Sequence, residues 1–322
     1  MSIALPEEEI APLNYFLHSY GPASTPTLHL GWVFASIVAM VFLIVAALLI
    51  AALVHKRQPD TGKIDNDDNG LRWIYIGTGI STFLLFGMAV YALLTLNAIT
   101  KPPQPPALTL TITGYDWWWK VEYEHDDPRL NFVTANEIHI PVGVPVLVKL
   151  KSADVIHAFW VPVLAGKTQM IPGLINRQWL QADIPGIYRG ECTQYCGLQH
   201  AHMALEVVAQ SPAEFRQWQA AQRKPAVLSS ASDIDAGRKT FMDHCSGCHS
   251  IRGTEAVGAH APDLTHLKSR RLIAGGTFVN TPEQQKQWIA HAQELKPGAR
   301  MPSMVLSPAE MASLSAFLST LD

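Results

Sequence analysis

Two long apolar runs without formal charge limit what this chain can fold into. They extend from Leu30 to Val54 and from Trp73 to Thr100. Each run exceeds the roughly 20 residues that a helix needs to cross a bilayer core. Two core helices of that length, side by side, are improbable in a soluble protein. The sequence therefore predicts a two-helix transmembrane hairpin, which we place at residues 30–101.

The basic residues that flank these runs predict the orientation of the hairpin. His55, Lys56, Arg57, Lys63 and Arg72 lie between the runs, whereas the N-terminal arm contains no Lys or Arg. Loops rich in Lys and Arg stay in the cytoplasm. We therefore expect an exported N-terminal arm at residues 1–29 and an exported segment after Thr100. The arm's three glutamates and lack of basic residues argue against a signal peptide.

A β-sandwich is the fold that the first exported segment favours. The proline-rich residues 101–106 end the second run, because proline stops helices and stiffens spacers. Alternating apolar residues then predict strands in 108–113, 137–150 and 203–208. Turn residues separate these strands. We place the sandwich at residues 107–210.

Helical signals replace the strand pattern after the sandwich. Ser211, Thr281 and Ser307 each precede a proline and lie three residues before Glu or Gln, the arrangement of a helix N-cap. We expect a helix and linker at residues 211–232, with the linker beginning at 223. A small all-α domain of about four helices should then occupy residues 233–322.

The motif Cys-Ser-Gly-Cys-His in the helical domain predicts covalently attached haem c. Its residues are Cys245, Cys248 and His249. In this signature both thiols bond to the porphyrin and the histidine ligates the iron. Two disulfides are the alternative for a chain with four cysteines in an exported segment. A disulfide leaves the adjoining histidine of this motif unexplained.

A methionine is the expected sixth ligand of the haem iron, since a soft ligand raises the potential of an electron carrier. Met301 and Met304 are the candidates. We favour Met301, because its Met-Pro sequence about fifty residues after the haem histidine resembles the sixth-ligand loop of small c-type cytochromes. Pro262 matches the loop proline that packs beside the histidine in those proteins.

The other two cysteines belong to a second cluster of metal-ligating residues. Cys192, Cys196, His200 and Met203 follow the spacing C-x3-C-x3-H-x2-M. A disulfide would leave the histidine and methionine unexplained, and zinc has little use for a thioether. Thiolate, imidazole and thioether ligands suit copper. Two cysteines can bridge two copper ions, each of which then needs an imidazole. His157 is the candidate for the second imidazole: it comes after a predicted strand, about thirty-five residues before the cysteines, an offset that suits a partner strand of the sandwich.

These motifs together resemble subunit II of the haem-copper cytochrome c oxidases. The resemblance extends over about residues 25–210 and rests on GYDWWWKVEY, DVIHAFWVP, KTQMIPG and PGIYRGECTQYCGLQHAHM. The remaining part resembles the cytochrome c domain that is fused to this subunit in some bacterial oxidases. The implied fold is a multidomain membrane protein: a two-helix transmembrane hairpin, a cupredoxin-like β-sandwich and an all-α class I cytochrome c domain.

The resemblance also implies the ligands and the partners. The binuclear copper ligands would be His157, Cys192, the backbone carbonyl of Gln194, Cys196, His200 and Met203. The protein would be the electron-entry subunit of a proton-translocating terminal oxidase in the bacterial inner membrane. Electrons would pass from a soluble cytochrome c or similar donor through haem c and copper to subunit I, which reduces oxygen. Subunit III and membrane lipid are further expected partners.

The tryptophan run at Trp117, Trp118 and Trp119 matches the electron-entry motif of the family. Alternate residues of a half-buried strand face opposite sides, so we expect Trp117 and Trp119 to share one face of a strand and Trp118 to lie on the other. The resemblance assigns electron entry to Trp117, with packing and a membrane-interface belt as the alternative. We expect the fused haem domain to dock near Trp117.

The sequence departs from the family at three places. Gln194 stands where many relatives have a glutamate that helps to bind magnesium, so the magnesium site is in doubt. Gln169 and Met170 replace an aspartate that is common before IPG. The start of the second run, NGLRWIYIG, has no glutamate for a proton-entry channel.

Four other functions are less consistent with the sequence. A quinol-oxidase subunit II lacks the copper ligands, and a nitrous-oxide reductase has a large catalytic propeller. A membrane-anchored copper-handling or copper-sensing protein would carry the same ligands and need no oxidase partner. Nucleic-acid binding is not expected, since the net charge is −3.

Overall fold

The computed structural model describes residues 17–55, 69–227 and 232–322. The chain divides into two compact units. One unit is Thr25–Lys101, and the other joins the N-terminal arm to Pro102–Asp322. The predicted cytoplasmic loop with Lys56, Arg57 and Lys63 lies outside the described residues, as do residues 1–16 of the predicted arm.

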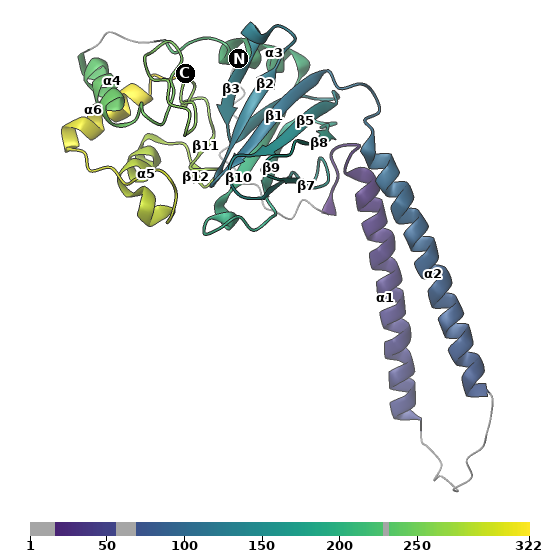
Figure 1. Ribbon diagram of the computed structural model, residues 1–322. Helices are drawn as coiled ribbons and strands as arrows, with labels where there is room; N and C mark the ends of the chain where they lie inside the picture. Colours follow the sequence, from purple (N-terminus) through teal and green to yellow (C-terminus); the bar gives the residue numbers. More distant parts are fainter. Residues whose placement is uncertain (1–16, 56–68, 228–231) are drawn as a thin grey trace. The chain divides into compact units, whose positions relative to one another are not determined.

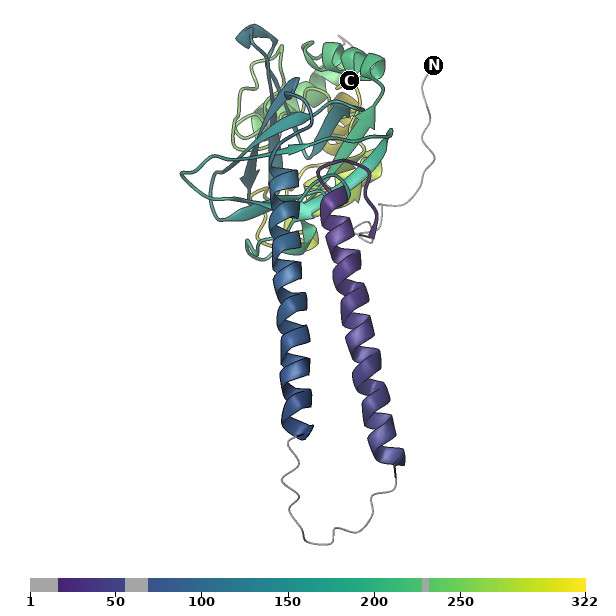
Figure 2. The ribbon, with the colours of Figure 1, turned by 90° about the vertical axis from the view of Figure 1, so that its right-hand side faces the viewer.

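The first unit is a pair of helices, α1 (Thr25–Val54) and α2 (Asn69–Thr100). They lie side by side and run in opposite directions (Figures 1 and 2). Both are long and apolar enough to cross a membrane. No residue of α1 is buried, and Leu53 is 85% exposed. Helices that expose apolar side chains on all faces need lipid around them. Helix α1 begins five residues before Leu30, the predicted start of the span.

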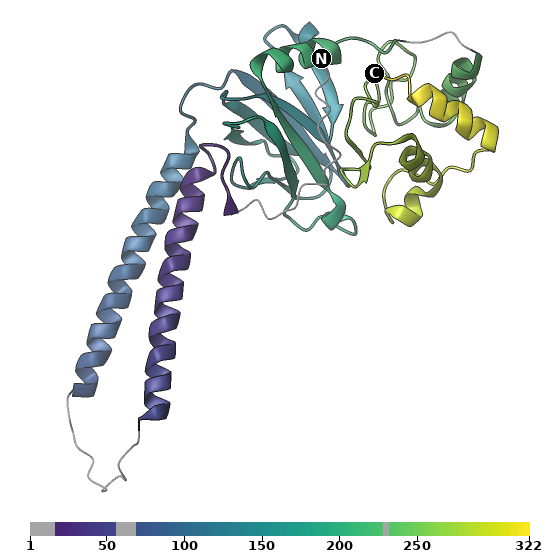
Figure 3. The same cartoon turned by 180° about the vertical axis from the view of Figure 1, so that it is seen from behind.

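The second unit contains a β-sandwich of two five-stranded sheets (Figures 1 and 3). The first sheet has the order β3 (Phe132–Ala135), β2 (Trp118–Glu124), β1 (Leu108–Tyr115), β5 (Val146–Ser152), β8 (Asn176–Leu180). The second has the order β4 (Glu137–Pro141), β10 (Ala204–Gln210), β9 (Gly186–Cys192), β6 (His157–Trp160), β7 (Thr168–Met170). The pairs β1–β5 and β4–β10 are parallel, and the other pairs are antiparallel.

The core of the sandwich follows from strand alternation. Trp119, Val121 and Tyr123 of β2 are almost fully buried, while the residues between them are partly exposed. Trp119 packs edge-on against Phe159 of β6, with ring centroids 5.9 Å apart. This contact joins the two sheets, because β2 and β6 belong to different ones.

Helix α3 (Pro212–Gln222) follows the last strand of the sandwich. Its predicted N-cap is confirmed: the Ser211 hydroxyl accepts a hydrogen bond from the Glu214 amide, and the Glu214 carboxylate accepts one from the Ser211 amide. Trp218 of this helix stacks on His139 of β4, with ring centroids 4.0 Å apart. The helix is thereby packed on the sandwich.

The C-terminal domain contains α4 (Ser232–His244), α5 (Pro282–Leu295) and α6 (Pro308–Leu318). Its described residues hold three α-helices, fewer than the predicted four or so. They also form a two-stranded hairpin, β11 (Leu272–Ile273) and β12 (Phe278–Val279), that the sequence did not predict. Thr281 and Ser307 cap their helices as predicted. Phe241 of α4 and Phe317 of α6 lie in the core of this domain.

Candidate metal centres

The predicted copper ligands gather at one end of the sandwich. His157 begins β6, Cys192 ends β9, and the others lie on the loop that joins β9 to β10. The amide of Cys192 donates to the carbonyl of Met203, which closes this loop at its base. The sulfur atoms of Cys192 and Cys196 are 3.8 Å apart, and both cysteines are free. A disulfide needs a sulfur separation of about 2.0 Å.

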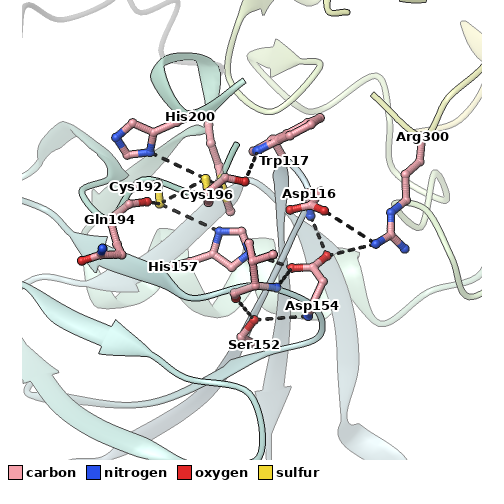
Figure 4. A network of polar contacts seen from close by, with 12 residues as sticks. Asp116, Trp117, Ser152, Asp154, His157, Cys192, Gln194, Cys196, His200 and Arg300 are labelled. Atoms are coloured by element: carbon pink, nitrogen blue, oxygen red, sulfur yellow. Dashed lines mark hydrogen bonds and ion pairs between the residues drawn. The ribbon is translucent and has the colours of Figure 1, made fainter. Parts of the chain in front are cut away.

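The remaining donor atoms surround the two sulfurs (Figure 4). On one side, the Cys192 sulfur lies 3.9 Å from His157 Nδ1 and 3.2 Å from the Gln194 carbonyl oxygen. On the other, the Cys196 sulfur lies 3.6 Å from His200 Nδ1 and 3.9 Å from Met203 Sδ. The side chains of Cys192, Cys196 and Met203 are almost fully buried. The structure thus brings together all six predicted donors from residues 157–203 of the sequence.

His157 is held from two sides. Its Nε2 is 2.8 Å from the Asp154 carboxylate, which leaves Nδ1 directed toward Cys192. A carboxylate partner fixes the tautomer and orientation of a metal-binding imidazole. Gly114 of β1 lies against the ring, since a Cβ at this glycine would be 2.9 Å from His157 Cδ2. The ring therefore has one accessible position.

Burial and hydrogen bonds set the charge of these side chains. Burial opposes protonation of His157, but the hydrogen bond to Asp154 and the contact with Cys192 outweigh it and raise the pKa of His157 to about 9. The hydrogen bond between the cysteines lowers the pKa of Cys192 to about 3 and raises the pKa of Cys196. One thiol is therefore ionised and the other must release its proton when metal binds.

The donor set fits copper. Two thiolates, two imidazoles, a thioether and a carbonyl are the mixed soft and intermediate ligands that copper prefers. One imidazole lies beside each sulfur. Strands β6 and β9 and the loop closed by Cys192 and Met203 hold the donors in place.

The haem motif lies beside a cavity of about 460 Å³ in the second unit. Cys245, Cys248 and His249 line this cavity, as do Met301 and Met304. The predicted thiols, the axial histidine and both candidate methionines therefore face one space. Burial, followed by the neighbouring thiol of Cys248, raises the pKa of Cys245 to about 11.

His249 is oriented as an axial ligand must be. Its Nδ1 is 2.8 Å from the carbonyl oxygen of Pro262, which leaves Nε2 free to bind iron. This contact confirms that Pro262 packs beside the histidine. Burial lowers the pKa of His249, so the imidazole is held in the neutral form that ligates metal.

Trp117 lies between the two centres, although not as the strand pattern predicted. β1 ends at Tyr115 and β2 begins at Trp118, so Trp117 is in the turn between them. The prediction that Trp117 and Trp119 share a face of one strand was wrong, because the chain reverses direction there. Trp117 is 8% exposed, its indole nitrogen donates to the Cys196 carbonyl at 3.0 Å, and it also lines the haem cavity.

Comparison with known proteins identifies the family. Residues 129–210 match the family of the cytochrome c oxidase subunit II periplasmic domain, and residues 234–322 match the cytochrome c family. The chain is 32% identical over 294 residues to cytochrome c oxidase subunit 2 of Alkalihalophilus pseudofirmus, covering 88% of this chain and 84% of that one. The chain belongs to the cytochrome c oxidase subunit 2 family.

The chain is also similar to two other proteins. Quinol oxidase subunit 2 of Bacillus cereus is 28% identical over 219 residues, covering 65% of this chain and 74% of that one. The periplasmic domain of subunit II of cytochrome oxidase from Bradyrhizobium japonicum is 30% identical, covers 37% of this chain and 96% of its own, and has a TM-score of 0.35.

Membership of the subunit 2 family establishes the general role. The protein is a subunit of an oxidoreductase complex that associates with subunit I, and its two domains imply copper and haem binding. It is a membrane-anchored protein with an extracytoplasmic domain.

Two of the departures from the family lie next to each other. The Gln169 side-chain amide donates to the side-chain oxygen of Gln194 at 3.4 Å. Two neutral amides therefore contact one another at two of the positions where the sequence departs from the expected pattern.

Three residues around the centres were not predicted. Asp154 orients His157, and Arg300 lies 3.4 Å from Asp154 and 3.7 Å from Asp116 (Figure 4). Lys296 donates to the Trp117 carbonyl. Asp154 and Arg300 lie next to predicted motifs, in DVIH and GARM, so proximity in sequence was a usable signal. No sequence pattern links Lys296 to a residue 179 positions away.

Proposed function

We propose that this protein is the electron-entry subunit of a respiratory cytochrome c oxidase. Electrons from a soluble cytochrome c or similar donor pass through haem c to a binuclear copper centre and on to the haems of subunit I, which reduce oxygen to water. The oxygen-reducing site is not in this chain. The complex translocates protons, and subunit III and membrane lipid are its other expected partners.

Trp117 is the observation that carries this proposal. One edge of the indole donates to the backbone of Cys196, and the residue lines the cavity that holds Cys245, Cys248 and His249. A single side chain thus contacts both candidate centres. A protein that only binds or senses copper would not need a haem cavity joined to its copper loop in this way.

The ligands have separate tasks in this proposal. Cys192 and Cys196 would hold the copper pair through their thiolates, with His157 and His200 supplying imidazole ligands and Met203 a thioether ligand. The Gln194 carbonyl would complete the set, and its side chain is not needed. When bound, the copper pair takes up and releases one electron without making or breaking covalent bonds in a substrate.

The haem domain would hold its cofactor through thioether bonds from Cys245 and Cys248. His249 and Met301 would hold the haem iron. The Pro262 carbonyl would keep the imidazole in place. A methionine ligand raises the potential of the iron, as an electron carrier requires.

The proposed location is the bacterial inner membrane, with two spans. The N-terminus and both folded domains would lie on the periplasmic side. The lysines and arginines between the spans support this orientation.

Purification of the whole chain from native membranes tests the proposed function. A haem-copper subunit I should copurify, and the complex should consume oxygen when reduced cytochrome c is supplied. Cys196→Ser should abolish oxygen consumption while haem c remains attached, because only the copper centre loses a bridging ligand. Recovery of the chain without subunit I, with copper bound, would favour a copper-handling protein instead.

A further inference from the structure

Lys296 follows helix α5 and is buried where the haem domain meets the sandwich. Only 2% of the residue is exposed. Burying an ammonium group is costly unless its donors are all satisfied. Burial lowers the pKa of Lys296 to about 7. A lysine at such a position needs specific hydrogen-bond partners. The sequence motifs assign no function to Lys296.

Three backbone carbonyls accept hydrogen bonds from the Lys296 ammonium group. They belong to Trp117 at 3.1 Å, His202 at 2.9 Å and Ala274 at 2.8 Å. Trp117 is on the β1–β2 turn, His202 on the copper loop, and Ala274 on the β11–β12 hairpin. An ammonium group has three donors. One side chain therefore joins the sandwich, the copper loop and the haem domain.

The residues after Lys296 continue this contact. The Gln199 side-chain amide donates to the Pro297 carbonyl at 2.9 Å. Gly298, with a φ of +80°, lies over Trp117: a Cβ there would be 3.6 Å from the Trp117 ring and 3.2 Å from Leu198. The copper loop and the chain that leads to Met301 are thus packed directly on each other.

Gly275 has no side chain, and this leaves room for the Lys296 ammonium group. A Cβ at Gly275 would be 2.5 Å from the Trp117 carbonyl oxygen and 2.7 Å from Lys296 Nζ. The carbonyl of Gly275 also accepts a hydrogen bond from the Ala204 amide at 2.9 Å. The β11–β12 hairpin of the haem domain therefore packs against Lys296 and hydrogen-bonds to Ala204, at the end of the copper loop that joins β9 to β10.

We propose that Lys296 is the positioning residue that holds the haem domain on the copper loop, with Trp117 enclosed between them. This inference rests on the proposed electron-entry function. It implies that a soluble donor reaches the haem domain and not Trp117, since Trp117 is covered by the protein's own residues. Electron transfer from haem to copper is then an event within one docked chain and needs no diffusional encounter.

Loss of the lysine should loosen docking without removing a ligand. Lys296→Met keeps the length of the side chain and removes the ammonium donors from three carbonyls. The single Thr277 hydroxyl, which contacts the His202 and Ala274 carbonyls, can serve only one of them, so at least two carbonyls lose their donor. Unpaired buried carbonyls are unfavourable, so they should gain water by separation of the surfaces. The linker still tethers the haem domain to the sandwich, so an undocked haem domain would rebind. It would spend less time in the position that allows electron transfer.

The experiment uses the whole chain with both cofactors, assembled with its oxidase partner. Hydrogen exchange is measured in the peptides that contain Ala204 and Gly275, and the rate of haem-to-copper electron transfer is measured after photoreduction of the haem. In Lys296→Met, the amides of both peptides should exchange faster. Electron transfer from haem to copper should be at least about tenfold slower, since a displacement of about an ångström can lower the rate of other reactions by that much or more. The copper and haem spectra should not change.

Lys286→Met is the matched control, because Lys286 is a partly exposed lysine on α5, the helix that Lys296 follows. It should behave as the unaltered protein in both measurements. If Lys296→Met does not assemble its cofactors, Gly275→Ala tests the same packing from the other side and should show the same two changes.

The two ideas fail in different ways. Unchanged exchange and an unchanged rate in Lys296→Met, with both cofactors in place, would overturn the role of the lysine. Absence of haem-to-copper transfer in the unaltered protein would instead overturn the proposed function.

Discussion

Asp154 shows how a residue outside the ligand set determines what a metal site can do. It does not face the sulfurs, yet it holds Nε2 of His157 at 2.8 Å and so directs Nδ1 toward Cys192. It also accepts the Asp116 amide at 2.9 Å. The orientation of the imidazole therefore depends on the turn that carries Trp117.

Asp154→Asn should weaken copper binding while the fold is retained. An amide of the same shape is a weaker partner for the imidazole, and loss of such partners typically costs about 10–100-fold in metal affinity. Copper affinity is measured by competition with a chelator of known strength. Asp126→Asn is the control, since Asp126 is exposed on a loop of the same sandwich. Equal affinity in the two variants would contradict the orienting role.

The ligand residues were the part of the site that sequence could predict. Cysteine, histidine and methionine at fixed short spacings can be recognised in a sequence, because few functions other than metal binding need them together. Asp154 and Lys296 could not be assigned, because aspartate and lysine are common and their roles depend on contacts formed only by folding.

At the scale of elements, two strands from opposite sheets determine the position of His157. Gly114 of β1 lies against the imidazole, which is itself on β6. A glycine in a strand usually weakens it, and its presence marks a close approach. The distance between the sheets at this end of the sandwich is thereby coupled to the copper site.

Gly114→Ala should displace His157 and lower copper affinity by about tenfold or more. The added Cβ would be 2.9 Å from His157 Cδ2, and the ring is fully buried, so it has little room to move. Gly166→Ala is the control, because a Cβ there would meet no atom within 4 Å. Circular dichroism checks that both variants fold. Unchanged copper affinity in Gly114→Ala would show that the ring position is not determined by β1.

Element prediction from sequence succeeded where the pattern was local. Helix caps at Ser211 and Ser307 need only four residues, and the Leu-Thr-Leu-Thr-Ile-Thr sequence of β1 alternates without interruption. It failed at Trp117, because three successive tryptophans suit a strand and the turn before Trp118 has no glycine or proline to mark it. It also missed the hairpin of β11 and β12, whose strands have two residues each.

At the scale of the whole second unit, the haem domain supplies cations and the sandwich supplies acceptors. Besides Lys296, Arg271 donates its amide to Glu137 at 2.9 Å and its side chain to Glu206 at 3.2 Å. Glu137 is nearly buried and also binds His139 at 2.8 Å. This contact lies on β4 and β10, and β10 pairs with β9, the strand that ends at Cys192.

The stability of the unit should depend on the ionisation of Glu137. Burial alone would raise the pKa of Glu137. The hydrogen bond to His139, the charge of His139 and the hydrogen bond from the Arg271 amide outweigh burial and lower the pKa below 4.5. The folded form therefore binds its proton less readily than the unfolded form. The stabilisation is fully present above about pH 4.5 and is lost as the pH falls through the lower, folded-state pKa.

Glu137→Gln should lower the thermal midpoint near neutral pH, by the loss of a charge-assisted hydrogen bond worth roughly 1–3 kcal/mol. The gap between variant and unaltered protein should narrow as the pH falls below about 4.5, because protonated Glu137 then resembles Gln. Thermal unfolding followed across this pH range measures the gap. A gap that stays constant would contradict the account of Glu137.

Metal content of the purified whole chain is the most direct test of the central claim that one protein holds both electron-transfer centres. The account predicts about two copper atoms and about one iron atom per chain, as expected of two bridging thiolates and one Cys-x-x-Cys-His motif. Cys196→Ser should lose the copper pair and keep the iron. One iron atom per chain without firmly bound copper would contradict the account.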